Sequence, residues 1–334
     1  MKKLTYSLLP LGITVGLCLN IAPASATLLV RNVIPDAALS IDGFGSLSNN
    51  GVIQANIPTG STIQRAYLYA TSIWDKSPVY DVIFHGTTLS VSSATILGPE
   101  QNPATTARWD VTSIIASSFT GGLQDFSILE NGDNDGEVLV VAYSNPSTQG
   151  FTSVILDGEL STTGDTVEFN FASIPYTGGA FLVSLASSYS RQPSGQFTQI
   201  DVTTNSTNNR RLTTSAGGAD DRTTGELSDN GNLITVGGIG DNPANVDPTA
   251  DPMHTNPDDE YYNLALGNSA NPAPFISLGD TFLRLTTQNP TDDDNVFGMF
   301  ITISPTPVPE PSMTLGIFGI GAIGALISRL GKKS

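Results

Sequence analysis

Short runs of β-branched, aromatic and apolar residues alternate with clusters of Gly, Asn, Asp and Pro along most of this 334-residue chain. The turn clusters recur about every 8 to 15 residues, and no stretch keeps a helical period for more than about three turns. This pattern predicts an all-β domain. Many short strands joined by long polar loops are typical of a β-sandwich of the jelly-roll or immunoglobulin-like kind.

The expected burial differs from strand to strand. Val167–Phe171 and Phe297–Ile303 alternate in polarity or size, which predicts strands with one face more buried than the other. Val138–Tyr143 is apolar on both faces and is predicted to be a central strand. Further strands are predicted at Ser61–Trp74, Val79–His85, Phe151–Leu160, Phe181–Tyr189, Gln196–Thr203, Leu233–Gly237 and Asp280–Thr287.

Two short helices are expected beside the strands. Asp110 is a good N-cap for a helix over Asp110–Ile115, and Asp258–Leu266 is a second candidate. The sequence has no repeat of fixed period, which argues against a solenoid or a propeller.

The N-terminus has the features of a secretory signal peptide. Lys2 and Lys3 precede the apolar run Leu8–Ile21, and Ala24 and Ala26 form the small-x-small pattern that signal peptidase accepts. The mature chain is therefore expected to begin at Thr27. The alternative is an uncleaved N-terminal anchor, against which the short apolar run and the cleavage pattern both argue.

Cysteine and charge restrict the chemistry of the mature chain. The single cysteine, Cys18, lies in the predicted signal peptide, so disulfides, thiolate zinc sites and cysteine nucleophiles are excluded. Five of the 14 Lys and Arg residues lie at the two ends, which leaves nine against 31 acidic residues, a balance of −22. Such a chain repels phosphate, which argues against nucleic-acid binding, and its carboxylates are available to divalent cations.

The C-terminal segment consists of a linker, an apolar stretch and a basic end. Ser304–Ser312 contains alternate prolines and is predicted to be extended and exposed. Residues 313–330 are long enough for one transmembrane helix, and Arg329, Lys332 and Lys333 form its cytoplasmic stop. The chain is thus divided into a signal peptide (1–26), a β-rich extracellular domain that forms one unit or two sub-domains (27–303), a linker (304–312), a membrane helix (313–330) and a basic end (331–334).

The linker contains Pro309, Glu310 and Pro311 immediately before the apolar stretch. This order of motif, helix and basic end resembles the PEP-CTERM sorting signal, which an exosortase recognises. An ordinary C-terminal anchor would explain the helix and the charges but not the Pro-Glu-Pro. The resemblance implies that signal peptidase and exosortase are partners, that the inner-membrane intermediate is transient, and that the product reaches the cell surface or the medium. Because proteins with this signal often occur in species that make exopolysaccharide, the resemblance also implies exopolysaccharide or other matrix components as partners.

Three phrases of the central domain resemble a recurring, uncharacterised ectodomain of PEP-CTERM proteins. They are Gly136–Pro146, Leu233–Asp241 and Asn289–Asn295. This second resemblance implies no known activity, substrate or catalytic residue.

Two acidic segments are candidates for calcium ligands. Asn131, Asp133 and Asp135 alternate as in the first half of a calcium loop, but the position where a bidentate Glu is needed is occupied by Ala142. An acidic hairpin turn explains the same residues. The second segment is denser in carboxylates, which repel each other unless they are solvated or share a cation; its candidate ligands are Asp292, Asp293, Asp294 and Asn295.

No catalytic residue is predicted. The two histidines, His85 and His254, are too few for a histidine metal centre, and no Gly-x-Ser-x-Gly is present. The leading hypothesis is a structural or adhesive surface protein without enzymatic activity. Calcium is its candidate cofactor and would stiffen the acidic loops. The alternative is a secreted carbohydrate-binding module or glycoside hydrolase, with Tyr67 and Tyr69, or Tyr261 and Tyr262, as a sugar-contact patch.

Overall fold

The computed structural model describes most of the central domain. The described residues are 28–45, 48–73, 78–97, 105–161, 163–173, 175–188, 197–216, 233–243, 245, 248–249, 260–291 and 295–305. The predicted signal peptide, the Pro-Glu-Pro motif and the membrane helix lie outside these ranges.

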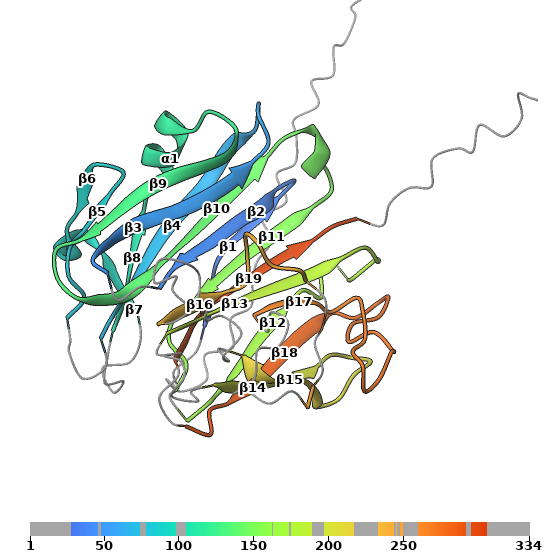
Figure 1. Ribbon diagram of the computed structural model, residues 1–334. Coiled ribbons are helices and arrows are strands. Elements are labelled where there is room, and N and C mark those ends of the chain that lie inside the picture. Colours follow the sequence, from blue (N-terminus) through green and yellow to red (C-terminus); the bar gives the residue numbers. More distant parts are fainter. Residues whose placement is uncertain are drawn as a thin grey trace, which may run out of the picture.

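Four antiparallel sheets are stacked face to face, which confirms the all-β fold class (Figure 1). Two of them form an N-terminal sandwich. Its outer sheet has the strand order β3 (Asn50–Ile57), β9 (Gly122–Glu130), β5 (Val82–Phe84) and β6 (Thr87–Leu89). Its inner sheet has the order β2 (Ala38–Phe44), β10 (Asn134–Ser144), β4 (Thr62–Ser72), β8 (Thr106–Asp110) and β7 (Thr95–Leu97).

The other two sheets form a C-terminal sandwich. Its inner sheet has the order β1 (Leu29–Pro35), β11 (Thr152–Asp157), β19 (Asn295–Ile303), β13 (Phe181–Ser188) and β16 (Ile234–Val236), and β17 (Tyr261–Asn263) also pairs with β13. Its outer sheet has the order β12 (Thr166–Asn170), β18 (Phe282–Gln288), β14 (Thr198–Thr203) and β15 (Arg210–Ala216). The helical elements are α1 (Thr112–Ser118) and the short 3₁₀ turns η1 (Val91–Ser93) and η2 (Pro146–Thr148).

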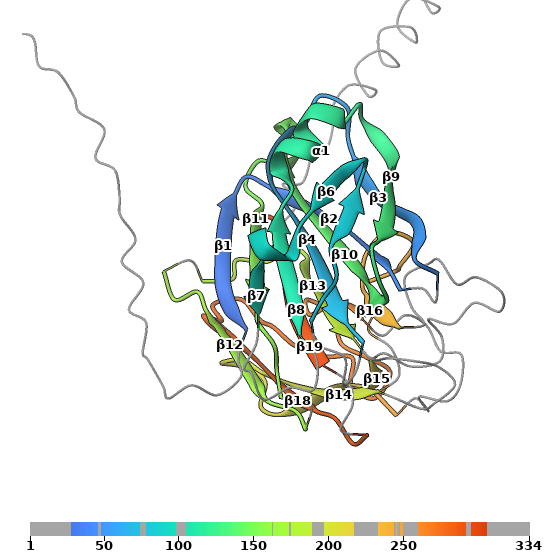
Figure 2. The same ribbon diagram turned by 90° about the vertical axis from the view of Figure 1, so that its left-hand side faces the viewer.

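The chain builds one sandwich after the other, with one exception. Strands β2 to β10 complete the N-terminal sandwich, and all later strands belong to the C-terminal one. The exception is β1, which pairs with β11 although it precedes every strand of the first sandwich. Figure 2 shows α1 at one end of the molecule and the outer C-terminal sheet at the other. Because β1 belongs to the C-terminal sandwich and is followed by β2 of the N-terminal one, the first strand connects the two sandwiches.

The central position predicted for Val138–Tyr143 is confirmed. These residues belong to β10, which pairs with β2 on one side and β4 on the other. Leu139 and Val141 point into the core of the N-terminal sandwich, whereas Val138 and Val140 point into a second core between the two inner sheets. Strand β10 is apolar on both faces because each face packs against another sheet.

The core between the inner sheets is rich in aromatic residues. Tyr69 of β4 lies 5.9 Å, centroid to centroid, from both Phe297 and Phe300 of β19. Phe300 is only 1% exposed, so the expectation that one face of Phe297–Ile303 is more buried than the other is wrong. The second face of β19 is covered because a second sandwich lies against it.

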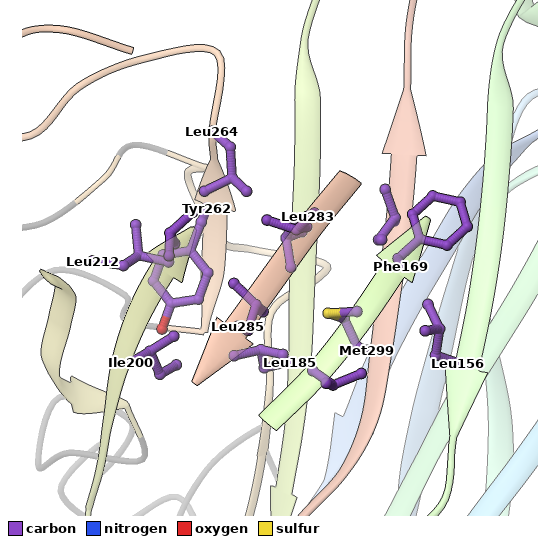
Figure 3. Packing of buried hydrophobic residues seen from close by; sticks show 14 of the residues in the cluster. Leu156, Phe169, Leu185, Ile200, Leu212, Tyr262, Leu264, Leu283, Leu285 and Met299 are labelled. Carbon is purple, nitrogen blue, oxygen red and sulfur yellow. The ribbon is translucent and has the colours of Figure 1, made fainter. Parts of the chain in front are cut away.

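The remaining core fills the C-terminal sandwich. Figure 3 shows Leu156, Leu185 and Met299 of the inner sheet facing side chains of the outer sheet, among them Leu283 and Leu285 of β18. In β12, Val167 and Phe169 are buried and Glu168 is exposed, as their alternation predicts. A fully buried aliphatic side chain contributes about 1.5–3 kcal/mol, so these clusters dominate the stability of the fold.

Side chains of β2 accept hydrogen bonds from backbone N–H groups of β3, the edge strand of the outer sheet. The Asp42 carboxylate accepts the backbone N–H of Gln54, and the Ser40 hydroxyl accepts that of Asn56 at 2.8 Å. Strand β3 would otherwise present these donors on an open edge, where they favour pairing with another chain. The two sheets of the N-terminal sandwich are thus joined along this edge by polar contacts.

The two helix predictions have different outcomes. A helix is present near Asp110, but it spans Thr112–Ser118, and Asp110 is the last residue of β8. The Asp110 carboxylate accepts the N–H of Thr112 at 3.0 Å. It therefore stabilises the turn between β8 and the helix, and the N-cap position is occupied by Val111. The second prediction is wrong: residues 260–266 form β17 and a turn.

Candidate functional site

Two glutamates point into the N-terminal sandwich from opposite sheets. Glu130 ends β9 and continues its inward face, which Phe126 and Ile128 also form. Glu137 lies on the face of β10 that carries Leu139 and Val141. Because side chains alternate along a strand, both carboxyl groups lie at the end of the same apolar core.

A glycine in a special conformation places Glu137 on this face. Gly136 has φ of 142°, and the register of β10 against β4 shifts between Asn134 and Gly136. A Cβ at Gly136 would lie 2.1 Å from the carbonyl oxygen of Phe44. This bulge accommodates the extra residue Asp135 while the strand keeps its apolar faces in register.

We expect Gly136→Ala to lower the free energy of unfolding by about 1–3 kcal/mol, because both the positive φ and the overlap with Phe44 must be relieved. Gly60→Ala is the matched control, since Gly60 also has a positive φ but no atom within 4 Å of its Cβ position. Urea unfolding compares the two variants. Equal losses would mean that the close approach to Phe44 is relieved at no cost.

Asn134 binds both glutamates. Its backbone N–H donates to Glu130 Oε2 at 3.1 Å, and its side-chain amide donates to Glu137 Oε1 at 3.5 Å. Its amide oxygen accepts the N–H of Tyr80 at 2.9 Å. The hairpin between β9 and β10 therefore holds the two carboxyl groups in fixed positions.

Burial perturbs both carboxyl groups strongly. Glu137 is fully buried, and burial followed by the charge of Glu130 raises its pKa well above the usual range. Burial also raises the pKa of Glu130 to about 7. Nearby, burial and the charge of Glu130 raise the pKa of Asp135.

The predicted calcium residues of this hairpin are only partly brought together. Asn131 and Asp133 are exposed, and Asp133 accepts a hydrogen bond from Asn49 at 3.2 Å. Asp135 is instead 6% exposed. Within the described ranges, no three His, Cys, Asp or Glu side chains are grouped to hold a metal ion. Calcium binding by Asn131, Asp133 and Asp135 stays a prediction.

The other predicted sites lie outside the described residues. They include Asp292, Asp293 and Asp294, the signal peptidase site at Ala24 and Ala26, the Pro-Glu-Pro motif and the basic end. Of Asn295, the structure describes only the backbone, which begins β19 opposite Ser188. None of the described helices is long and apolar enough to cross a membrane, and segment 313–330 is not among them.

Sequence reasoning missed Glu130 and Glu137. The signal that could have found them is alternation: Phe126, Ile128 and Glu130 share one parity, and so do Glu137, Leu139 and Val141. Each glutamate therefore extends an inward apolar face by one position.

A second buried cluster joins the two inner sheets. Asp157 of β11 is fully buried and accepts hydrogen bonds from Arg31 of β1 and Arg108 of β8. The hydroxyl of Tyr69 donates to the same carboxylate at 3.0 Å. Arg108 also lies over the ring of Tyr67, 5.0 Å from its centroid. All of these groups are paired, which indicates a structural role.

One small cavity of about 240 Å³ lies between β2 and the turn after β16. Ser40, Asn56, Gly238–Gly240 and Tyr261 contribute to its lining, and no carboxylate does. Tyr261 is partly exposed there, whereas Tyr262 is fully buried. Of the two tyrosine pairs considered for sugar contact, Tyr69 and Tyr262 are therefore core residues.

The comparisons with known proteins concern mainly the C-terminus. Residues 307–332 match the PEP-CTERM protein-sorting motif, and the matched range includes Pro309, Glu310 and Pro311. The sequence matches none of the curated proteins. Among solved structures, the major capsid protein P2 from bacteriophage PM2 aligns with 81% of this chain and 99% of its own, at 11% identity and a TM-score of 0.21. That likeness is too low to support an argument.

The fold and the motif together define an exported protein with an all-β ectodomain. More specifically, the chain carries the sorting motif of the PEP-CTERM proteins, the substrates of exosortases.

Proposed function

We propose that this protein acts as a structural or adhesive component of the cell surface or the extracellular matrix, without enzymatic activity. The observation that carries the proposal is the sorting motif at residues 307–332, which directs the domain to the envelope. The fold supports it, because three apolar cores pack the four sheets against one another.

The position of the linker suits a domain that is delivered by cleavage. Strand β19 ends at Ile303, and the last backbone hydrogen bond of the described residues joins Ser304 N–H to the carbonyl of Ala180 at 3.0 Å. A cut in or after the Pro-Glu-Pro motif would therefore leave every described strand intact. Matrix exopolysaccharide is the partner that we propose for the delivered domain.

The competing function is that of a secreted glycoside hydrolase or carbohydrate-binding module. A hydrolase needs two carboxyl groups about 5 Å or more apart across an open cleft. The Glu130 and Glu137 side chains are instead buried at the end of the apolar core, where Asn134 binds both. The cavity beside Tyr261 lacks a carboxylate and favours contact with a ligand over its hydrolysis.

The test is the intact mass of the protein recovered from its native host. We expect the wild-type mass to lack residues 1–26 and the residues after the Pro-Glu-Pro motif. Replacing Pro309, Glu310 and Pro311 by Ala should leave the tail attached and keep nearly all of the protein in the membrane fraction. Thr306→Ala, in the same linker but outside the matched range, is the control and should be processed normally.

An uncut wild-type tail would make the chain an ordinary membrane-anchored protein and contradict the sorting step. For the proposed role, cosedimentation of the processed protein with the host exopolysaccharide is the direct measurement. Binding without release of reducing sugar supports adhesion, whereas release of reducing sugar would contradict a role without catalysis.

A further inference from the structure

The carboxyl pair of Glu130 and Glu137 has unused ligand capacity. Glu130 Oε2 accepts the backbone N–H of Asn134, and Glu137 Oε1 accepts its side-chain amide. The other two oxygens, Glu130 Oε1 and Glu137 Oε2, receive no hydrogen bond from any described N–H or O–H group. Both atoms are buried, and the two carboxyl groups face each other from opposite sheets.

The described part of the chain supplies no positive charge to this pair. Its ion pairs all involve other acids, namely Asp110, Asp157, Asp201 and Glu168. Asp135, which is buried beside Glu130, adds further negative potential. Buried carboxylates without a cation cost several kcal/mol, so a proton or a cation must compensate them.

We propose that Glu130 and Glu137 bind one divalent cation, calcium, through their buried and otherwise unpartnered carboxylate oxygens. Both ligands are carboxylates, which hard cations prefer, and calcium tolerates irregular coordination completed by backbone carbonyls and water. The site differs from the predicted loop site, because it uses the inward glutamates and not Asn131 or Asp133. Since the two ligands come from facing sheets, the ion would hold the end of the N-terminal sandwich closed.

The experiment uses the protein released by its native host, stripped with chelator and titrated with calcium chloride at pH 8. We expect one bound calcium per chain by isothermal titration calorimetry and a rise in Tm of several degrees at saturation. Glu137→Gln should weaken calcium binding by more than about tenfold and remove the rise in Tm. Asp133→Asn should keep both, within about threefold in affinity, which separates this site from the predicted loop site.

Three results would overturn the proposal. One is a wild-type protein that neither releases heat nor gains Tm with calcium, which would leave a proton as the compensating charge. Another is a Glu137→Gln variant that binds calcium as the wild type does. Glu130→Gln repeats the test if Glu137→Gln fails to fold. Lys76→Met tests whether a lysine supplies the compensating charge instead, because Lys76 is the only Lys or Arg between Arg65 and Arg108. Calcium binding by this variant at the wild-type affinity supports the site. The third overturning result is that Lys76→Met lowers the Tm while neither protein responds to calcium, which would assign the compensating charge to Lys76.

Discussion

Asp157→Asn is expected to lower the free energy of unfolding by about 3–5 kcal/mol, because it leaves two arginines beside a buried position that no longer carries a charge. The substitution removes the charge that pairs with Arg31 and Arg108 while keeping the shape of the side chain. Asp157 is fully buried and Arg108 is 14% exposed, so the arginine left behind is poorly solvated. Urea unfolding monitored by circular dichroism gives the magnitude.

The control for this prediction is Asp110→Asn. Asp110 pairs with Arg65 at 2.8 Å, but both side chains are well exposed, so the loss should stay below about 1 kcal/mol. Tyr69→Phe removes only the hydrogen bond to Asp157 and should fall between the two, at about 1.5–3 kcal/mol. If Asp157→Asn behaves like Asp110→Asn, the arginines reach water and the cluster does not hold the inner sheets together.

The pattern of polar and apolar residues along the strands predicted the fold class but not the number of stacked sheets. Val138–Tyr143 was predicted to be central because apolar residues occupy both faces, and β10 is central. The alternation in Phe297–Ile303 suggested a less buried face, yet Phe300 is buried against Tyr69. A period of two does not say whether another sheet will cover a face. It also fails at the bulge in β19, where Phe297 shares a core with Phe300 and not with Met299.

The stacking of two sandwiches depends on contacts between residues distant in sequence. Arg108 and Asp157 are 49 positions apart, and Arg31 and Asp157 are 126 apart. No local pattern pairs these residues, since a lone charged side chain in a strand is typical of a solvated face. The ion cluster therefore becomes visible only when the sheets are in place.

Turn chemistry accounts for the remaining differences. Asp110 resembles a helix N-cap, and its carboxylate does bind the nearby N–H of Thr112, but this contact ends a strand. The Asn-Gly-Asp-Asn-Asp-Gly segment was interpreted as a calcium loop or an acidic turn. Both interpretations treat Asp133 and Asp135 as one exposed group, whereas Asp133 is exposed and Asp135, which lies in the bulge at the start of β10, is buried.

In the metal-free protein, the stability should fall as the pH rises through the titration of the glutamate pair. Burial raises the pKa of Glu130 from the ordinary 4.5 to about 7 in the folded state. Between these values the folded protein retains a proton that the unfolded chain has lost, so the free energy of unfolding decreases with pH. At 1.36 kcal/mol per pKa unit, the total loss is about 3 kcal/mol above pH 7.

The comparison of wild type with Glu130→Gln removes the acids that do not interact with Glu130, and it measures Glu130 together with its effect on the pKa values of Glu137 and Asp135. In chelator, the stability of the wild type relative to the variant should fall by about 3 kcal/mol between pH 4 and pH 8, because Gln does not titrate. The groups that face Glu130 are Glu137, Asp133 and Asp135, and the variant retains all three. Parallel pH curves for the two proteins would show that Glu130 is solvated in the folded state, and the buried pair would then be an incorrect description of the end of this sandwich.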